Sequence, residues 1–121
     1  MTITEQLAFA EIERVKSYSK LRKTWHFGIG AISHNIIEKT INVISVLSVI
    51  KDFESIATYP EADGTISLVI EYNGEEYVSI EIDNKELFYW SHEECIGYNV
   101  TSLHSDKSTL YELANYIKEM K

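Results

Sequence analysis

Hydrophobic positions at the start of the chain recur with the period of an α-helix. Over residues 3–22 the apolar positions recur every three or four residues after an adjacent pair, as the buried stripe of an amphipathic helix requires. These positions are Leu7, Ala8, Ile12, Val15, Tyr18 and Leu21. Thr2 and Glu5 have the spacing of a capping box, which satisfies free N–H groups where a helix begins. The pattern predicts a first helix over 3–22.

A second helix is predicted over 34–52, where apolar residues cover more than half of the circumference. Glu38, Asn42, Ser45 and Asp52 leave only a narrow polar edge. Its β-branched residues would also suit strands, but the length of the run and the lack of breaking residues favour a helix. A helix that is apolar nearly all round is buried on more than one side. We therefore expect it to lie across a sheet, with another helix or a second subunit over it.

From Ile56 onward the hydrophobic period changes to two, which is typical of β-strands. A turn at 60–64 precedes three apolar runs at 65–72, 76–82 and 86–91, which are separated by short polar segments. This series predicts an antiparallel meander. Residues 98–103 are a candidate for a fourth or fifth strand. Capping residues and a stripe of apolar positions then predict a C-terminal helix, whose stripe is Leu110, Leu113, Ala114, Tyr116 and Ile117.

The strand register follows from keeping one face of the sheet apolar, because a slip of one residue exchanges the two faces. A three-residue connection at 73–75 aligns Leu68 with Ile80, although Asn-Gly at 73–74 is a signal for a two-residue turn. The same connection length at 83–85 aligns Ile80 with Phe88 and Val78 with Trp90.

The two sheet faces then differ in character. The predicted core face comprises Ile66, Leu68, Ile70, Val78, Ile80, Ile82, Phe88 and Trp90. The predicted opposite face comprises Ser67, Val69, Glu71, Tyr77, Ser79, Glu81, Leu87 and Tyr89. Apolar residues rimmed by carboxylates are typical of protein interfaces, although scattered apolar residues on a sheet face need no explanation.

The length of 121 residues fits one domain spanning 1–121. The sequence thus predicts an α+β fold with two N-terminal helices, an antiparallel meander of three to five strands and a C-terminal helix. We expect the helices to pack on one face of the sheet. A single cysteine, Cys95, fits a reducing compartment, and no secretory or membrane-spanning pattern is evident, so a cytoplasmic protein is expected.

Charge changes this picture because it is unevenly distributed. Residues 54–99 contain eleven acids and one base, Lys85, whereas residues 1–53 contain five acids and seven bases. The net charge is −8. An acidic field argues against duplex nucleic acid as a direct ligand and favours a basic partner. The longest apolar stretch, 41–50, is too short to span a bilayer, so no membrane partner is expected.

Candidate chemistry is sparse. His92 and Cys95 are metal-ligand types, but four neighbouring ligands are needed for structural zinc. Gly28 and Gly30 lack the third glycine and the Lys-Ser/Thr pair of phosphate loops. We therefore predict no enzyme, no cofactor, no catalytic residue and no metal site. A small-molecule binder or enzyme using the loops at 25–31 and 92–95 remains an alternative.

Two segments of the chain carry recognisable motifs. The first is a Trp-x-Gly-x-Gly-Ala-like loop with Trp25, Gly28, Gly30, Ala31 and Ser33. The second is a Pro-x-x-Asp-Gly-x-Ile strand motif with Pro60, Asp63, Gly64, Ile66, Leu68 and Glu71. Together they resemble the motifs of a family of small bacterial proteins of unassigned function, often encoded on plasmids, prophages and other mobile elements. One residue is inserted after Trp25, and Tyr72 replaces the family's strand tryptophan. The resemblance covers about residues 20–118 and implies toxin neutralisation, immunity or anti-defence inhibition by genomic association.

The sequence hypothesis is a non-enzymatic acidic protein that binds a basic protein partner, such as a toxin, nuclease or defence protein. The expected partner-binding residues are Glu71, Glu75, Glu76, Tyr77, Glu81 and Tyr89. A homo-oligomeric structural or regulatory protein, with a homodimer as its simplest form, is the alternative from a different class.

Overall fold

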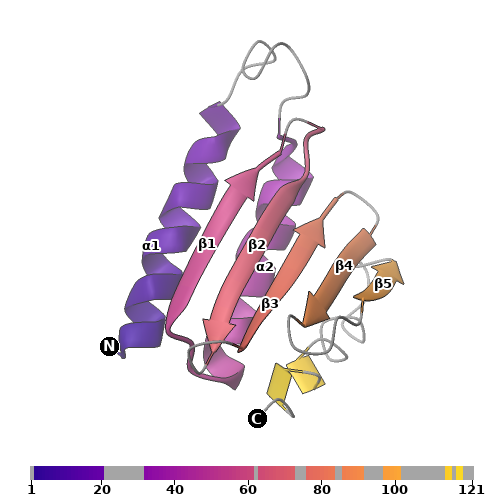
Figure 1. The fold of residues 1–121 in the computed structure, drawn as a ribbon. Coiled ribbons are helices and arrows are strands. Elements are labelled where there is room, and N and C mark those ends of the chain that lie inside the picture. The colour runs from indigo at the N-terminus through magenta and orange to yellow at the C-terminus, as the bar shows by residue number, and fades with distance from the viewer. Residues whose placement is uncertain are drawn as a thin grey trace.

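The computed structural model describes residues 2–20, 32–61, 63–72, 76–83, 86–91, 97–101, 114–115 and 117–118, and for 76–77, 86–91 and 97–101 it describes the backbone alone. Along these residues two helices precede five strands (Figure 1). The elements are α1 Ile3–Ser17, the 3-10 turn η1 Tyr18–Lys20, α2 His34–Ile50, β1 Ser55–Pro60, β2 Ile66–Tyr72, β3 Glu76–Ile82, β4 Glu86–Ser91 and β5 Gly97–Thr101. The α+β order predicted for the helices and the meander is confirmed.

Both helices begin with a side chain that accepts one of their free N–H groups. Thr2 Oγ1 accepts the N–H of Glu5 at 3.0 Å, which confirms the predicted start of α1. Ser33 Oγ accepts the N–H of Ile36 at 3.3 Å and begins α2 in the same way. These caps lie directly before the amphipathic runs and fix where each helix starts.

The first helix ends earlier than the sequence predicts. Ser17 Oγ donates to the carbonyl oxygen of Arg14 at 2.5 Å, and Ser19 Oγ donates to that of Lys16 at 2.9 Å. Hydroxyls that bond to carbonyls of the preceding turn compete with the regular helical ladder. The backbone accordingly tightens into η1 after Ser17.

The strands form one antiparallel meander in the order β1-β2-β3-β4-β5. Leu68 lies opposite Ile80, and the neighbouring pairs Ile70–Val78 and Ile66–Ile82 complete the same register. The predicted three-residue connection between β2 and β3 is therefore confirmed. It places the branched aliphatic residues of both strands on one face, where they can be buried together.

The predicted register between β3 and β4 is wrong by one residue. Ile80 pairs with Tyr89 rather than with Phe88, and Val78 pairs with Ser91 rather than with Trp90. Phe88 and Trp90 therefore occupy positions opposite Glu81 and Ser79. Leu87 and Tyr89 occupy positions opposite Ile82 and Ile80, whose side chains are buried. The apolar run in β4 has large residues at both parities, so its hydrophobic pattern does not discriminate between the two registers.

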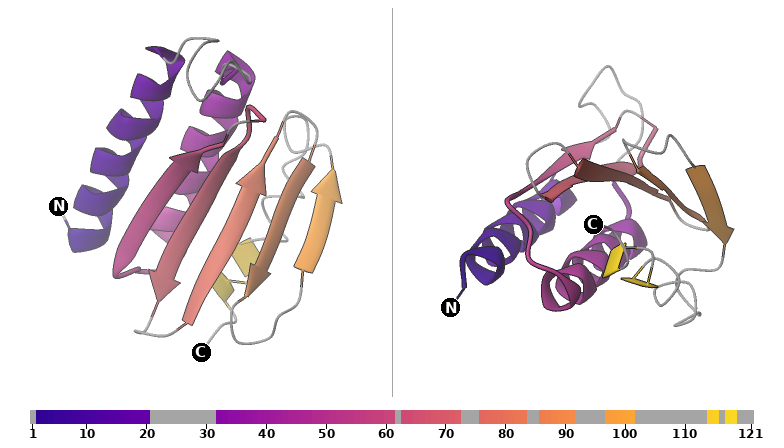
Figure 2. Two further views of the ribbon diagram at one scale, coloured as in Figure 1. Left: turned by 45° about the horizontal axis from the view of Figure 1, so that its top comes forward. Right: turned by 60° about the horizontal axis from the view of Figure 1, so that its bottom comes forward.

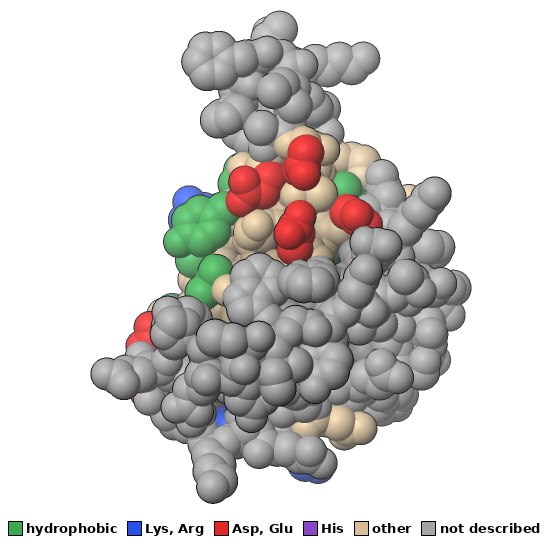
Figure 3. Space-filling model, turned by 45° about the vertical axis from the view of Figure 1, so that its right-hand side comes forward, with side chains coloured by type: hydrophobic (Ala, Val, Ile, Leu, Met, Phe, Trp, Pro, Cys, Tyr) green, Lys and Arg blue, Asp and Glu red, His purple; other side chains and the backbone are tan. Residues whose placement is uncertain are grey.

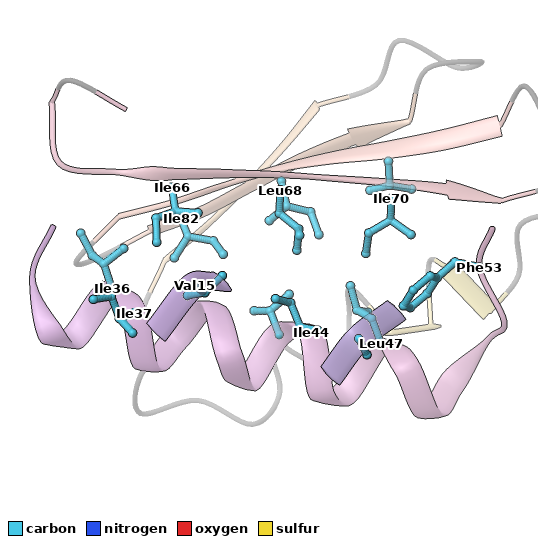
Figure 4. Packing of buried hydrophobic residues seen from close by; sticks show 14 of the residues in the cluster. Val15, Ile36, Ile37, Ile44, Leu47, Phe53, Ile66, Leu68, Ile70 and Ile82 are labelled. Atoms are coloured by element: carbon cyan, nitrogen blue, oxygen red, sulfur yellow. The ribbon is translucent and has the colours of Figure 1, made fainter. Parts of the chain in front are cut away.

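Both N-terminal helices lie on the same side of the sheet, which we call the inner face (Figure 2). The side chains of β2 alternate between buried and half-buried, and the buried ones point toward α2 (Figure 4). Fully or almost fully buried residues from both layers form one cluster that includes Val15, Ile44, Leu47, Ile66, Leu68, Ile70, Val78, Ile80 and Ile82. Burial of each such side chain contributes about 1.5–3 kcal/mol, so this layer dominates the stability of the fold.

One seam of α1 faces the sheet. Its buried residues recur at alternating steps of four and three: Thr4, Ala8, Glu11, Val15 and, in η1, Tyr18. The predicted stripe included Ala8, Val15 and Tyr18 but assigned no burial to Thr4 or Glu11. α1 contacts both α2 and β1, so the seam lies beside the first strand of the sheet.

The predicted C-terminal helix is only partly within the described residues. Ala114, Asn115, Ile117 and Lys118 have helical backbone, and the side chains of Ala114 and Ile117 are buried. Ile117 belongs to the same hydrophobic cluster as the inner face of the sheet. Among the helices that the structure describes, none has the length and hydropathy needed to cross a membrane.

Adjacent residues of β2 provide a direct test of the two faces. Leu68→Ala should lower the free energy of unfolding by about 2–5 kcal/mol, because it leaves a cavity between β2 and α2. Val69→Ala removes a half-buried side chain from the opposite face and should cost less than about 1 kcal/mol. Urea unfolding of both variants measures the difference. Equal losses would contradict the assignment of the faces.

Candidate functional site

The candidate site lies on the sheet side that faces away from α1 and α2, which we call the outer face. Its described side chains come from alternate positions of three strands: Ala57 and Tyr59, Ser67, Val69 and Glu71, and Ser79 and Glu81. Most of these side chains are small and half-buried. Tyr59 is the largest of them and is 51% exposed.

A depression of about 460 Å³ opens at the end of this face where β1 turns into β2. Five side chains line it, and we call this group the acidic depression: Glu61, Asp63, Thr65, Ser67 and Glu81. Ser67 and Glu81 are directly opposite each other in the β2–β3 register. The turn brings Glu61 and Asp63 to that pair, so three carboxylates meet on one surface.

The turn itself is held by Asp63. Its Oδ1 accepts the backbone N–H of Thr65 at 3.0 Å and the Thr65 hydroxyl at 2.7 Å. These two hydrogen bonds favour the charged form and lower the pKa of Asp63. Gly64 has a φ of 91°, a conformation that favours glycine, and its N–H donates to the carbonyl oxygen of Glu61 at 3.0 Å.

Glu81 is in a different electrostatic position. Partial burial on the sheet raises its pKa, and the negative charges of Asp63, Asp83 and Glu61 raise it further. Like charges therefore repel one another across the acidic depression. Asp63 is compensated by its hydrogen bonds to Thr65, whereas Glu81 has no hydrogen bond or ion pair within the described residues.

A lysine approaches this end of the sheet from α2. Lys39 is buried, and its Nζ donates to the carbonyl oxygen of Asp83 at 3.3 Å. Burial lowers the pKa of Lys39, and the charge of Asp83 acts against that shift. Because α2 covers the inner face, Lys39 does not line the acidic depression.

The described charges on one face of the molecule agree with these contacts. Figure 3 shows carboxylate side chains gathered beside hydrophobic ones, while the described Lys and Arg side chains are visible only at the margins of that view. Neither Glu61 nor Glu81 forms a salt bridge with a described residue. Within the part of the chain that the structure describes, no group of three or more His, Cys, Asp or Glu residues is suited to holding a metal ion.

The predicted partner-binding residues do not form one group. Glu81 lines the acidic depression, and Glu71 is half-buried further along β2. Tyr77 is opposite Glu71 in the register, and Glu76 is opposite Tyr72. Glu75 lies outside the described residues. The assignment of Tyr89 to the outer face rested on the wrong β3–β4 register, since its position is opposite the buried Ile80.

Sequence reasoning missed Glu61 and Asp63 as members of the site. The signal that could have found them is the β2–β3 register, which places Glu81 opposite Ser67, two residues from the turn. The position of Glu61 and Asp63 beside Ser67 also depends on the pairing of β1 with β2, which the sequence did not predict. The alternative sites at 25–31 and 92–95 lie outside the described residues.

Comparison with known proteins provides no further assignment. No protein-family model, curated protein or solved structure matches this chain. The resemblance to mobile-element proteins therefore stays a prediction from the sequence.

Replacement of Glu81 tests the repulsion in the acidic depression. Folding raises the pKa of Glu81, so the protonated form of this carboxyl stabilises the folded state relative to the charged form. This stabilisation is lost as the pH rises through the pKa that Glu81 has in the folded protein. Glu81→Gln should therefore increase the free energy of unfolding at neutral pH, by about 0.2–0.5 kcal/mol because the site is exposed and screened. The gain should shrink on acidification through the pKa of Glu81 and at about 0.5 M salt.

Urea unfolding at several pH values measures this effect, with Glu71→Gln as a control that removes a carboxylate from the same face outside the acidic depression. A loss of stability in Glu81→Gln at neutral pH would show that Glu81 makes a favourable interaction in place of the repulsion.

Proposed function

We propose that this protein is a non-enzymatic binding protein that engages a basic protein partner through the outer face of its sheet. The observation that carries the proposal is the acidic depression, in which the pKa of Glu81 is raised by burial and by the charges of Asp63, Asp83 and Glu61. A cationic side chain placed there would remove the repulsion that the free protein sustains.

The chemistry of the site favours a basic protein over a nucleic acid as the partner. Three carboxylates repel phosphates, whereas they attract Lys and Arg side chains. Complementary fields of this kind speed encounter and reject partners of the wrong charge. A toxin, nuclease or defence protein has the required character, and the predicted resemblance to mobile-element proteins supports an antitoxin-like, immunity or anti-defence role by association.

Aromatic residues beside the carboxylates would supply affinity. Tyr59 is half-exposed on the outer face of β1, and Tyr77 occupies a position opposite Glu71. Tyrosines are enriched at the centres of protein interfaces, where they bury a large area at low entropic cost. The proposed contact surface therefore runs from the acidic depression along β2 and β3.

Neutralising the acidic depression should slow capture of the partner. The partner is first identified by its enrichment on the immobilised wild-type protein from the native cell, and its binding kinetics are then measured. Glu61→Gln/Glu81→Gln should reduce the association rate about ten-fold at low ionic strength and much less at high salt. Glu13→Gln on α1 provides a control for loss of one exposed carboxylate elsewhere. Equal rates for wild type and the double variant would eliminate the acidic depression as the contact.

Removing Tyr77 should weaken the complex itself. Tyr77→Ala is expected to lower the binding free energy by about 2 kcal/mol or more, as for other aromatic hot spots. Phe9→Ala is the matched control, because Phe9 is an exposed aromatic residue on α1. Calorimetric titration against the identified partner measures both variants. An unchanged affinity for Tyr77→Ala, or an equal loss for Phe9→Ala, would remove Tyr77 from the proposed interface.

A second candidate function, homo-oligomerisation, is favoured by α2. Residues 40–50 of this helix contain no charged side chain, and Val49 is 85% exposed. An uncharged helix face adds no local repulsion when two copies of an acidic chain approach each other. Sedimentation at micromolar concentration tests this candidate. A monomer, or a dimer that Val49→Glu leaves intact, would exclude the α2 face as the interface.

A further inference from the structure

The strand β1 is at one end of the sheet and pairs only with β2 among the described strands. In an antiparallel pair, alternate residues direct their N–H and C=O groups toward the partner strand and the others direct them away. The N–H of Glu61 donates to the carbonyl oxygen of Thr65 at 2.9 Å. Glu61, and every second residue before it, therefore directs its backbone groups toward β2. Thr58 consequently directs its backbone groups toward the free edge, as do Ile56 and Pro60.

Side chains of α1 and η1 bond to the edge-facing groups of Thr58. Glu11 Oε2 accepts the N–H of Thr58 at 3.1 Å and its hydroxyl at 2.5 Å. The Tyr18 hydroxyl lies 2.8 Å from Thr58 Oγ1 and 3.2 Å from the carbonyl oxygen of Thr58. Because the Thr58 hydroxyl donates to Glu11, Tyr18 is the donor and shares its phenolic hydrogen between these two acceptors. All three residues are buried. An ionised carboxylate is a strong acceptor, so Glu11 replaces the carbonyl that a neighbouring strand would offer.

The same seam of α1 bonds to the chain just before β1. Thr4 Oγ1 accepts the N–H of Phe53 at 3.1 Å and donates to its carbonyl oxygen at 3.3 Å. Thr4, Glu11 and Tyr18 are seven residues apart, which is close to two helical turns, so they lie along one line of the helix. Figure 1 shows α1 lying along the side of β1. Pro60 has no N–H to offer at the far end of the strand.

The sequence of β1 explains why such contacts matter. Exposed edge strands are usually protected by charged side chains, because an unpaired edge is a template for another strand. β1 reads Ser-Ile-Ala-Thr-Tyr-Pro and contains no charge. Within β1 itself, therefore, no charged side chain opposes an antiparallel pairing of two copies about a two-fold axis.

We propose that Thr4, Glu11 and Tyr18 form an edge guard that prevents β1 from pairing with β1 of a second copy of this chain. The edge guard occupies the hydrogen-bonding groups that strand addition would use, and its loss converts β1 into a self-association site. This role is independent of the proposed partner on the outer face, because the edge guard acts at the side of the sheet.

Amide hydrogen exchange followed by NMR tests the contact. In Glu11→Ala the Thr58 amide should exchange about ten-fold faster or more than in wild type, since its charged acceptor is lost. The Leu68 amide faces β3 and should keep its wild-type rate, which shows that the sheet remains folded. Glu13→Ala removes an exposed carboxylate from the same helix and should leave both rates unchanged.

Sedimentation tests the consequence. Glu11→Ala/Tyr18→Phe should associate at concentrations where wild type and Glu13→Ala do not, and adding Ala57→Lys should reverse the association through repulsion across the two-fold pair. If Glu11→Ala fails to fold, Thr4→Val/Tyr18→Phe, which preserves side-chain volume, is measured in the same way. An unchanged Thr58 exchange rate, or wild-type sedimentation of the folded variant over the whole concentration range, overturns the proposal.

Discussion

The structure depends on the dry contact between α2 and alternate side chains of β2 and β3. Ile66, Leu68 and Ile70 from β2 are fully buried against this helix, together with their cross-strand partners on β3. Because strand side chains alternate strictly, burial of these residues turns their sequence neighbours outward. The polar outer face, with Ser67 and Glu81 side by side, is thus a geometric consequence of the apolar inner one.

The two helices stabilise the sheet in different ways. α2 contributes aliphatic area to the inner face, whereas α1 combines Ala8 and Val15 in the core with Glu11 at the edge. A buried carboxylate is costly unless it is fully bonded, and here Thr58 provides two donors to it. That arrangement allows one helix to pack against the core and terminate the sheet at the same time.

The sequence predicts those parts of the fold in which one face is clearly apolar and the other is not. The β2–β3 register was predictable because only one alignment gathers Leu68 and Ile80 into the core. The register between β3 and β4 was not predictable, because the adjacent residues Phe88 and Tyr89 are both large and either could face the core. Glu11 was missed because a charged residue on a helix is usually solvated, and its burial depends on Thr58, 47 residues away.

The carboxylates of the acidic depression differ in what the fold requires of them. Asp63 holds the β1–β2 turn through Thr65, so its presence has a structural explanation. Glu61 and Glu81 have no such side-chain bonds within the described residues. Burial raises the pKa of Glu81, and the charges of Asp63, Asp83 and Glu61 raise it further. Repulsion at an exposed site costs a few tenths of a kcal/mol, which is small beside the burial of a single isoleucine. The core can therefore sustain a charge cluster that does not help folding, and a cationic partner would supply the compensation that the free protein lacks.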